Sequence, residues 1–275
     1  MYRIKSVKLY FFSIFKIFYL SFKNLYLTSN FYNKKGLKSK NNITLDSDLF
    51  EDNRPIAREY IKKCRLKIIK HIPKKGINFL DFASGPIQYK EYLKYSNNFK
   101  LRHCVDFSKD AITIAKKKLK KRGKYYNNDF LKIKFKENYF DCSLSMHTIY
   151  HIDKTLQEKT VRKLLKITKP HKPVIIVYSN PHPLIKKIYS IFVKPKKNKS
   201  LYFYCHPIEW WERFQDISKI EFYCWRSFSS QHQKIIFPDN FIGTNMFKIL
   251  FYLENKFINF FYKNFQYPII ILKKK

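Results

Sequence analysis

Residues 77–88 of the chain read Ile-Asn-Phe-Leu-Asp-Phe-Ala-Ser-Gly-Pro-Ile-Gln. The mostly apolar run 77–82 predicts a buried strand, and a turn centred on Gly85 follows it. Pro86 suits the first position of a helix, because the N–H that proline lacks would be unpaired there. A glycine in such a turn lets a ligand approach the backbone closely, beside the N–H groups of the helix. The stretch therefore predicts a strand, a ligand-binding turn and a helix that opens near Pro86.

Strands and helices continue to alternate after this stretch. A strand over 101–106 is predicted to end at Asp106, and Ser108 has the side chain of an N-cap for a helix that runs to Arg122. Asp153 is expected to cap a later helix in the same way. The other predicted elements are helices 54–71, 154–168, 207–217 and 241–264, and strands 124–128, 139–146, 173–178, 219–225 and 267–272.

This alternation predicts an α/β fold with a doubly wound, mostly parallel seven-stranded sheet. Helical additions are expected at the N-terminus and before the last strand. Residues 1–52 are interpreted as an amphipathic helix and a linker, and residues 53–275 as the α/β domain. That domain is predicted to carry a basic insertion at 184–205 and a helical insertion at 228–266.

Three acids occur where predicted strands end. Asp81 closes the first strand, and Asp106 follows 25 residues later. In open α/β sheets ligands bind at the carboxyl ends of strands, so Asp106 stands where a carboxylate would bind two ribose hydroxyls. Asp129 follows the third strand, beside the expected position of an adenine. The three acids predict a nucleotide-type site.

Three motifs at this spacing resemble one enzyme family. They are Ser-Gly-Pro-Ile-Gln-Tyr at 84–89, Cys-Val-Asp at 104–106 and Ser-Met-His-Thr-Ile-Tyr-His at 145–151. Together they resemble the class I S-adenosylmethionine-dependent methyltransferases, of the type 11-like kind with Ser-Gly-Pro-Ile-Gln-Tyr in the loop. The first motif of that family typically reads Asp-x-Gly-x-Gly-x-Gly, and here Ala83 and Ile87 replace two of its glycines. The resemblance covers about residues 76–180.

The resemblance implies a Rossmann-like methyltransferase domain that binds S-adenosylmethionine. Gly85 would admit the amino-acid end of the cofactor, and Asp106 would hold its ribose. A nicotinamide dinucleotide is the alternative cofactor, but it expects Gly-x-Gly-x-x-Gly, of which two glycines are missing. A non-catalytic protein that only binds the cofactor is a further alternative. The residues expected at the cofactor are Asp81, Ala83, Gly85, Asp106, Phe107, Asp129, Phe130 and Ser145.

The candidate catalytic residues follow the fourth strand, where this fold meets its acceptor substrate. His147 and His151 are suited to orient or deprotonate an acceptor hydroxyl near neutral pH. His206, Tyr204 and Trp210 are candidates for acceptor binding. The alternative interpretation is that these rings only shape the pocket or cap helices. The five cysteines are widely spaced without a Cys-x-x-Cys pair, so we expect no metal site.

The chain carries 56 Lys and Arg against 20 Asp and Glu, a net charge of +36, and 19% of its residues are aromatic. AT-rich codons could supply many of the lysines. However, acids are absent before Asp46 and between Glu158 and Glu209, which indicates local basic surfaces. Lysines interleaved with aromatics are typical of surfaces that contact anionic lipid, and nucleic acid is the alternative partner. The acceptor is thus expected to be a small molecule of amphiphilic or lipid-linked kind, with an RNA or other nucleic acid as the alternative.

Two segments carry this pattern on predicted helices. In residues 3–25 four lysines fall in one narrow wedge opposite aromatic residues, and in helix 241–264 lysines and asparagines share one face. The apolar stretch 9–22 is too short to span a bilayer and contains Lys16. We therefore expect a cytoplasmic protein, with peripheral contact at the inner membrane surface as the alternative. Glu254 falls on the apolar side of its helix, where Arg226 is an available partner.

Overall fold

The computed structural model describes residues 39–40, 43–44, 51–184 and 202–275. The predicted N-terminal helix and most of the predicted basic insertion lie outside the described residues. In the described part, no helix is both long and apolar enough to cross a membrane. Two short antiparallel strands of two residues each, β1 (Ser39–Lys40) and β2 (Ile43–Thr44), precede the main domain.

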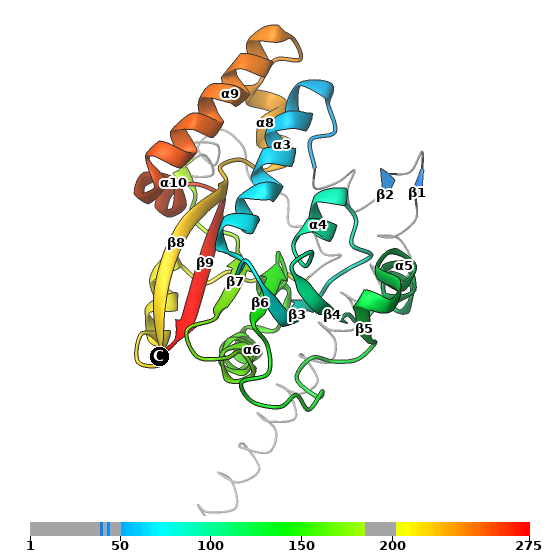
Figure 1. Ribbon diagram of the computed structural model, residues 1–275. Coiled ribbons are helices and arrows are strands. Elements are labelled where there is room, and N and C mark those ends of the chain that lie inside the picture. The colour runs from blue at the N-terminus through cyan, green and yellow to red at the C-terminus, as the bar shows by residue number, and fades with distance from the viewer. Residues whose placement is uncertain (1–38, 41–42, 45–50, 185–201) are drawn as a thin grey trace, which may run out of the picture.

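A seven-stranded sheet forms the centre of the molecule (Figure 1), in the order β5-β4-β3-β6-β7-β9-β8. All neighbours are parallel except β9, which is antiparallel to both β7 and β8. The predicted fold class, a mostly parallel seven-stranded sheet in an α/β domain, is therefore confirmed. The strands are β3 (Gly76–Phe82), β4 (Phe99–Val105), β5 (Gly123–Tyr126), β6 (Cys142–Met146), β7 (Pro173–Val177), β8 (Ser218–Arg226) and β9 (Tyr267–Lys274).

Helices cover both faces of this sheet because successive strand residues point to opposite faces and both sets are apolar. Leu80 and Phe82 pack with α6 (Lys154–Ile167) and a 3-10 segment at Ile208–Phe214. Phe79 faces the other way and packs beside the 3-10 turn Ile68–His71 that ends α3. That second face is covered by α3 (Pro55–Lys67), α4 (Lys90–Lys94) and α5 (Lys109–Leu119).

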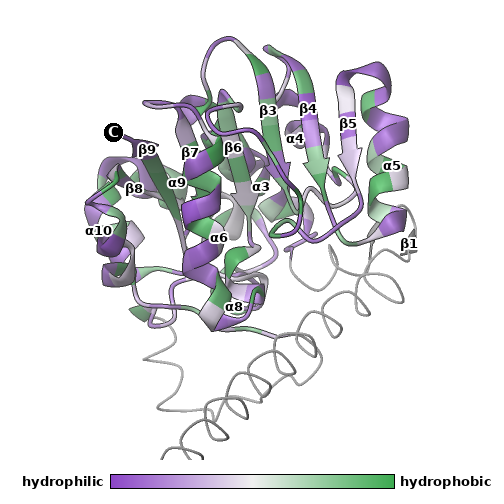
Figure 2. Cartoon of the chain, turned by 90° about the horizontal axis from the view of Figure 1, so that it is seen from below, coloured by the Kyte–Doolittle hydropathy of each residue, from purple (hydrophilic) through white to green (hydrophobic). Residues whose placement is uncertain are grey.

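Three further helices extend the domain beyond β8. They are α8 (Ser230–Ile236), α9 (Phe241–Lys256) and α10 (Ile258–Asn264). Helix α9 lies beside α3 (Figure 1), and the stacked rings of Tyr60 and Phe247 join the two. Figure 2 shows α10 and α5 at opposite edges of the sheet. The helical addition before the last strand thus packs against both α3 and β8, where the Phe222 and Tyr262 rings are stacked.

Both predicted N-caps are confirmed. The Ser108 hydroxyl accepts a hydrogen bond from the Ala111 N–H at 3.2 Å, and the Asp153 carboxylate accepts one from the Thr155 N–H at 3.0 Å. Each cap satisfies an N–H that the first turn of a helix leaves without a partner.

Three predicted boundaries are wrong: the start of the helix near Pro86, the unbroken helix 241–264 and the end of strand 124–128. No helix opens near Pro86; the chain stays irregular to Tyr89 because the loop continues through Ile87 in the left-handed region. The predicted helix 241–264 is broken at Phe257, whose backbone leaves the helical region. The predicted helix 207–217 is a 3-10 helix at Ile208–Phe214, and α8 lies within the predicted helical insertion 228–266. Strand β5 ends at Tyr126, three residues before Asp129.

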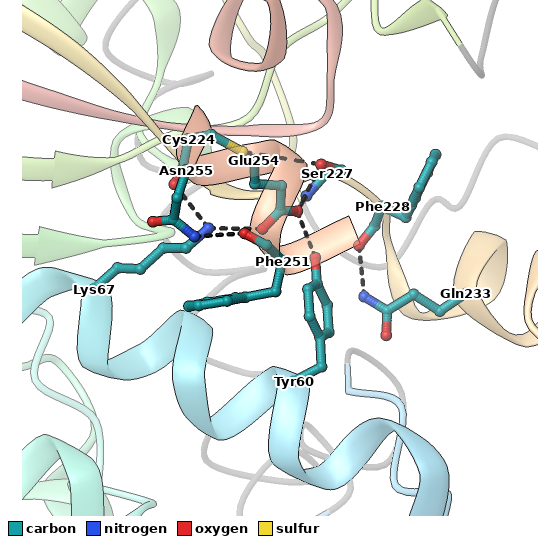
Figure 3. Close-up of polar contacts among 9 residues, drawn as sticks. All are labelled: Tyr60, Lys67, Cys224, Ser227, Phe228, Gln233, Phe251, Glu254 and Asn255. Carbon is teal, nitrogen blue, oxygen red and sulfur yellow. Dashed lines mark hydrogen bonds and ion pairs between the residues drawn. The ribbon is translucent and has the colours of Figure 1, made fainter. Parts of the chain in front are cut away.

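Glu254 is buried, but its ionic partner differs from the expected Arg226. Its carboxylate accepts hydrogen bonds from the Lys67 ammonium and the Tyr60 hydroxyl of α3, both at 2.6 Å (Figure 3). It also accepts from the N–H (2.9 Å) and hydroxyl (2.6 Å) of Ser227, just after β8. Glu254 therefore ties α9 to α3 and to the end of β8.

Candidate active site

The carboxyl ends of three neighbouring strands place the candidate cofactor residues at one edge of the sheet. In the strand register Phe82 of β3 lies opposite Val105 of β4 on one side and Ser145 of β6 on the other. Asp106 follows β4 and His147 follows β6, so the two residues leave the same edge of the sheet on either side of β3. Adjacent strands are about 4.8 Å apart, so Asp106 and His147 begin only about 10 Å from each other.

The segment 83–87, which we call the cofactor loop, keeps a glycine-like backbone although two of the family's glycines are absent. Ala83, Gly85 and Ile87 have φ angles of 55°, 55° and 49°. These three positions correspond to the three glycines of the family motif. A β-branched residue in this region is strained, at a cost of about 1–3 kcal/mol. The strain at Ile87 is offset by its side chain, which is 1% exposed and packs beside Ile112 and Leu119.

Asp106 lies against this loop. Its carboxylate accepts hydrogen bonds from the backbone N–H groups of Gly85 and Ser108, both at 2.8 Å. Burial raises the pKa of Asp106 to about 6, although the hydrogen bonds from Ser108 and Gly85 act in the opposite direction. The predicted pair of Gly85 and Asp106 is thus brought together by a direct contact.

Asp81 lies two residues before the loop, but its carboxylate is paired. It forms a buried ion pair with the guanidinium of Arg102 on β4, whose Nε donates at 2.9 Å. Arg102 also donates to the Tyr92 carbonyl at 2.6 Å. Arg102 was missed in the sequence, because nothing local shows that it faces Asp81 across the β3–β4 pair. The arginine fixes the acid at the base of the loop.

Of the remaining candidate cofactor residues, two are half-buried at the rim of the candidate site and two are buried in the protein interior. Asp129 accepts a hydrogen bond from the Leu131 N–H at 2.8 Å and is half-buried. Phe107 is also half-buried, and its carbonyl accepts from the Asn127 side chain at 2.7 Å. By contrast, the Phe130 ring is 2% exposed and stacks on Phe82 within the core. The hydroxyl of Ser145 is buried and has no hydrogen-bond partner among the described residues.

His147 and His151 both follow β6 and are joined through Tyr150. The Tyr150 hydroxyl is 2.9 Å from Nδ1 of His147, and its ring centroid is 4.5 Å from that of His151. The Tyr202 carbonyl is 2.8 Å from Nδ1 of His151. Burial lowers the pKa of His147 well below its ordinary value and that of His151 to about 4. Both rings are therefore neutral at physiological pH.

The three predicted acceptor-binding residues lie together, because the Tyr204 and His206 ring centroids are 4.9 Å apart and His206 in turn contacts Trp210. The Tyr204 N–H donates to the Tyr150 carbonyl at 2.8 Å. The His206 ring stacks on Trp210 with centroids 4.3 Å apart, and burial lowers the pKa of His206. Tyr204 is 38% exposed, whereas Trp210 is largely buried.

His147 is surrounded by residues that the sequence did not single out. Its ring lies 4.6 Å from that of Trp225 and 5.1 Å from that of Tyr267. The Arg226 guanidinium lies over the same two rings, at 4.7 Å and 5.1 Å. Because β9 is antiparallel to both its neighbours, the end of β8 and the start of β9 reach the edge where β6 ends. We call His147, Trp225, Arg226 and Tyr267 the aromatic edge.

Residues 80–176 match the family model described as a methyltransferase domain. No curated protein matches the sequence. The fold resembles a SAM-dependent methyltransferase from Archaeoglobus fulgidus, with a TM-score of 0.52 and 17% identity over 79% of this chain and 94% of that one. It also resembles the PH0226 protein of Pyrococcus horikoshii OT3, with a TM-score of 0.52 and 15% identity over 83% and 96% of the two chains.

A further solved structure shows what the fold alone leaves open. The [4+2]-cyclase SpnF aligns with a TM-score of 0.50 and 13% identity over 78% of this chain and 81% of its own. A fold shared with a cyclase does not by itself specify the reaction.

Proposed function

We propose that this chain, which is a class I S-adenosylmethionine-dependent methyltransferase, acts on an amphiphilic acceptor at an anionic membrane surface. The matched residues 80–176 include the carboxyl ends of β3, β4, β5 and β6.

The residues of the cofactor loop fit this cofactor. A side chain built at Gly85 would meet nothing within 4 Å, so open space lies over the turn. In the proposed arrangement Gly85 admits the amino-acid end, Asp106 accepts hydrogen bonds from the ribose hydroxyls, and Asp129 flanks the adenine. Since the Phe130 ring is in the core, only its backbone is available to that rim.

The bound cofactor supplies a methyl group on a sulfonium. The chain has to hold the acceptor atom in line with that methyl group and to remove the acceptor's proton. His147 and His151 are neutral, so each can accept a proton without first losing one. If His151 is the base, turnover should stay constant from about pH 8 down to pH 5, because its pKa is about 4. Intact turnover in the double variant His147→Ala, His151→Ala would leave positioning alone to account for catalysis.

The observation that carries the membrane proposal is the outer surface of α9 and α10. Six large apolar side chains there are between 49% and 75% exposed, and Lys248, Lys256 and Lys263 are exposed among them. The sequence predicted lysines and asparagines on one face and apolar residues on the other. The structure instead buries Phe247, Leu250 and Glu254 and exposes a mixed surface. The exposed apolar residues are Phe241, Ile242, Ile249, Tyr252, Phe257 and Phe260.

This mixture matches the chemistry of an anionic lipid surface. Apolar side chains can enter the headgroup boundary, and each nearby lysine adds about 1 kcal/mol of attraction to anionic lipid. The Lys256 ammonium lies 5.5 Å from the rings of both Tyr252 and Phe257, so charge and aromatic surface are presented together. An acceptor with a lipid tail would lie in the same membrane surface to which α9 and α10 bind.

Vesicle sedimentation tests the membrane proposal. We expect the protein to sediment with anionic but not neutral vesicles, and less at high salt. Phe241→Ser with Ile249→Ser should abolish sedimentation, whereas Ile77→Ser, which changes an apolar residue on β3 that is 49% exposed, should not. Sedimentation with none of the vesicles, or retention on RNA in their place, would contradict the proposal.

The acceptor class is tested by incubating a cell extract with the protein and methyl-labelled cofactor. The extract is then partitioned between organic and aqueous phases, and the labelled product is identified by mass spectrometry. Label in the organic phase that depends on Asp106 supports a lipid-linked acceptor. Label confined to RNA or to polar metabolites contradicts it.

A further inference from the structure

A cavity of about 230 Å³ opens between α3 and the segment that leads from the cofactor loop to α4. No function described so far uses it. Its lining residues are Asp52, Asn53, Arg58, Ile61, Arg65 and Tyr89.

The lining has an excess of positive charge. Its one carboxylate, Asp52, is held by Arg54, which is not a lining residue and donates to both carboxylate oxygens at 2.9 and 2.7 Å. Arg58 is exposed at the mouth, whereas Arg65 is 9% exposed. Two arginines therefore face the cavity without a carboxylate of the lining left to pair with them.

Arg65 is incompletely satisfied although it is buried. Its Nη atoms lie 3.5 Å from Glu51 and 3.6 Å from Glu91, which is beyond good hydrogen-bond length. Its Nε has no hydrogen-bond partner among the described residues. Its guanidinium lies flat on the Tyr89 ring, 3.2 Å from the centroid, and this contact holds the group in place. Buried donors of a charged group are costly unless an acceptor meets them.

A second buried arginine connects this cavity to the aromatic edge. Arg226 donates at 3.0 Å to Oε2 of Glu51, the same oxygen that faces Arg65. The Nε of Arg226 also lacks a partner among the described residues. One carboxylate oxygen thus serves two buried guanidinium groups. Arg226 in turn lies over the Trp225 and Tyr267 rings that surround His147.

We infer that this cavity binds an anionic group, a phosphate or a carboxylate, with Arg65 and Arg58 as its ligands. A guanidinium presents paired donors that match the oxygens of such groups. Contacts from Arg65 to Glu51 and from Glu51 to Arg226 link this cavity to the surroundings of His147. An acceptor bound by its anionic group there would have the rest of its structure directed toward His147. That last step rests on the proposed function, whereas anion binding itself does not.

Titration of inorganic phosphate into the full chain, followed by calorimetry, tests the site. We expect Arg58→Gln and Arg65→Lys each to weaken phosphate binding about tenfold, since a hydrogen bond to a charged group is lost. Lys62→Gln is the matched control, because it removes one positive charge from the same helix without lining the cavity. Equal affinity in Arg58→Gln, Arg65→Lys and Lys62→Gln would overturn the inference.

Glu51→Gln is expected to have the opposite effect on phosphate affinity to that of the arginine variants. Removing the carboxylate that occupies both arginines should raise phosphate affinity and increase the thermal stabilisation by phosphate, a result that misfolding could not produce. Unchanged or weaker phosphate binding in Glu51→Gln would also overturn the inference. Affinity for S-adenosylmethionine, measured on each variant, should not change. If the wild type did not bind S-adenosylmethionine, the proposed function would be contradicted, whereas the inference of an anion site would not be affected.

The source of the anion is identified with a soluble short-chain phosphatidate. If it binds more tightly than inorganic phosphate and competes with it, the site recognises a headgroup of the acceptor. If both bind equally, the site takes free phosphate. Either result requires the arginine dependence above, and binding of neither ligand contradicts the site.

Discussion

The cofactor loop and the aromatic edge lie at the ends of neighbouring strands, yet they are built in different ways. The cofactor loop is a single run of residues whose function depends on its backbone: three left-handed positions and the N–H of Gly85 against Asp106. The aromatic edge is assembled from side chains that follow β6 and end or begin β8 and β9.

The difference shows how each site tolerates sequence change. A loop defined by backbone shape can exchange glycines for Ala83 and Ile87 as long as the same φ angles are kept. An edge defined by side chains requires the correct residue at each position. It also requires a rigid frame, by which we mean the packing of the helices and strands that hold those residues in place. Glu254 supplies part of that frame, because it binds Ser227 next to Arg226 and Lys67 on α3. The four predictions below test this contrast.

The largest effect is expected from breaking the frame of the aromatic edge. Glu254→Ala leaves the Lys67 ammonium buried without its partner, which should lower the free energy of unfolding by about 3–5 kcal/mol. Urea denaturation measures this value. The control is Glu59→Ala on the outer face of α3, where an exposed ion pair contributes under about 1 kcal/mol. Similar losses in the two variants would show that the frame does not depend on Glu254.

The next effect concerns the acid beside the cofactor loop. Asp106→Ala should weaken binding of S-adenosylmethionine by about 1–3 kcal/mol, because the ribose hydroxyls lose their acceptor. Isothermal titration compares this variant with Asp110→Ala, which removes an exposed acid four residues later. Wild-type affinity in Asp106→Ala would contradict the assignment of the ribose site.

Cofactor affinity should also depend on pH through the same carboxylate. Burial raises the pKa of Asp106 to about 6, and the ionised form is the one that accepts from both hydroxyls. Affinity should therefore be constant above about pH 7 and fall by up to tenfold, about 1.4 kcal/mol, for each pH unit below 6. Asp106→Asn should bind more weakly with a flat profile between pH 5 and 8. A wild-type profile as flat as that of Asp106→Asn would rule out this carboxylate.

The smallest effect is expected within the loop itself. Ala83→Gly relieves a left-handed alanine, worth about 1–2 kcal/mol, while glycine adds about 0.5–1 kcal/mol of chain entropy to the unfolded state. The net gain should be about 1 kcal/mol or less, seen as a small rise in Tm. Ala111→Gly, in the first turn of α5, is the control and should lower Tm. A fall in Tm for Ala83→Gly equal to that of the control would mean that the loop is not strained at Ala83.

Much of the fold and one part of the site could be predicted because their signals are local. The apolar run of β3 and the caps Ser108 and Asp153 depend on residues close in sequence. The placement of Asp106 near Gly85 follows because the two residues come directly after consecutive parallel strands, whose carboxyl ends meet at one edge of the sheet. The start of α4 was wrong for a related reason. Proline is compatible with a helix start, but it cannot reveal that Ile87 continues the loop with a positive φ.

The sequence by itself determined the order of strands and helices, the resemblance to a methyltransferase domain that residues 80–176 match, and the residues that end β3 and β4. Only the tertiary structure decided which distant residues meet: Asp81 with Arg102, Glu254 with Lys67, and Arg226 with Glu51. Periodicity reports which face of an element is buried, but not which element covers it. The partner of a buried charge depends on strand register and on helix packing, and both are set by the whole chain.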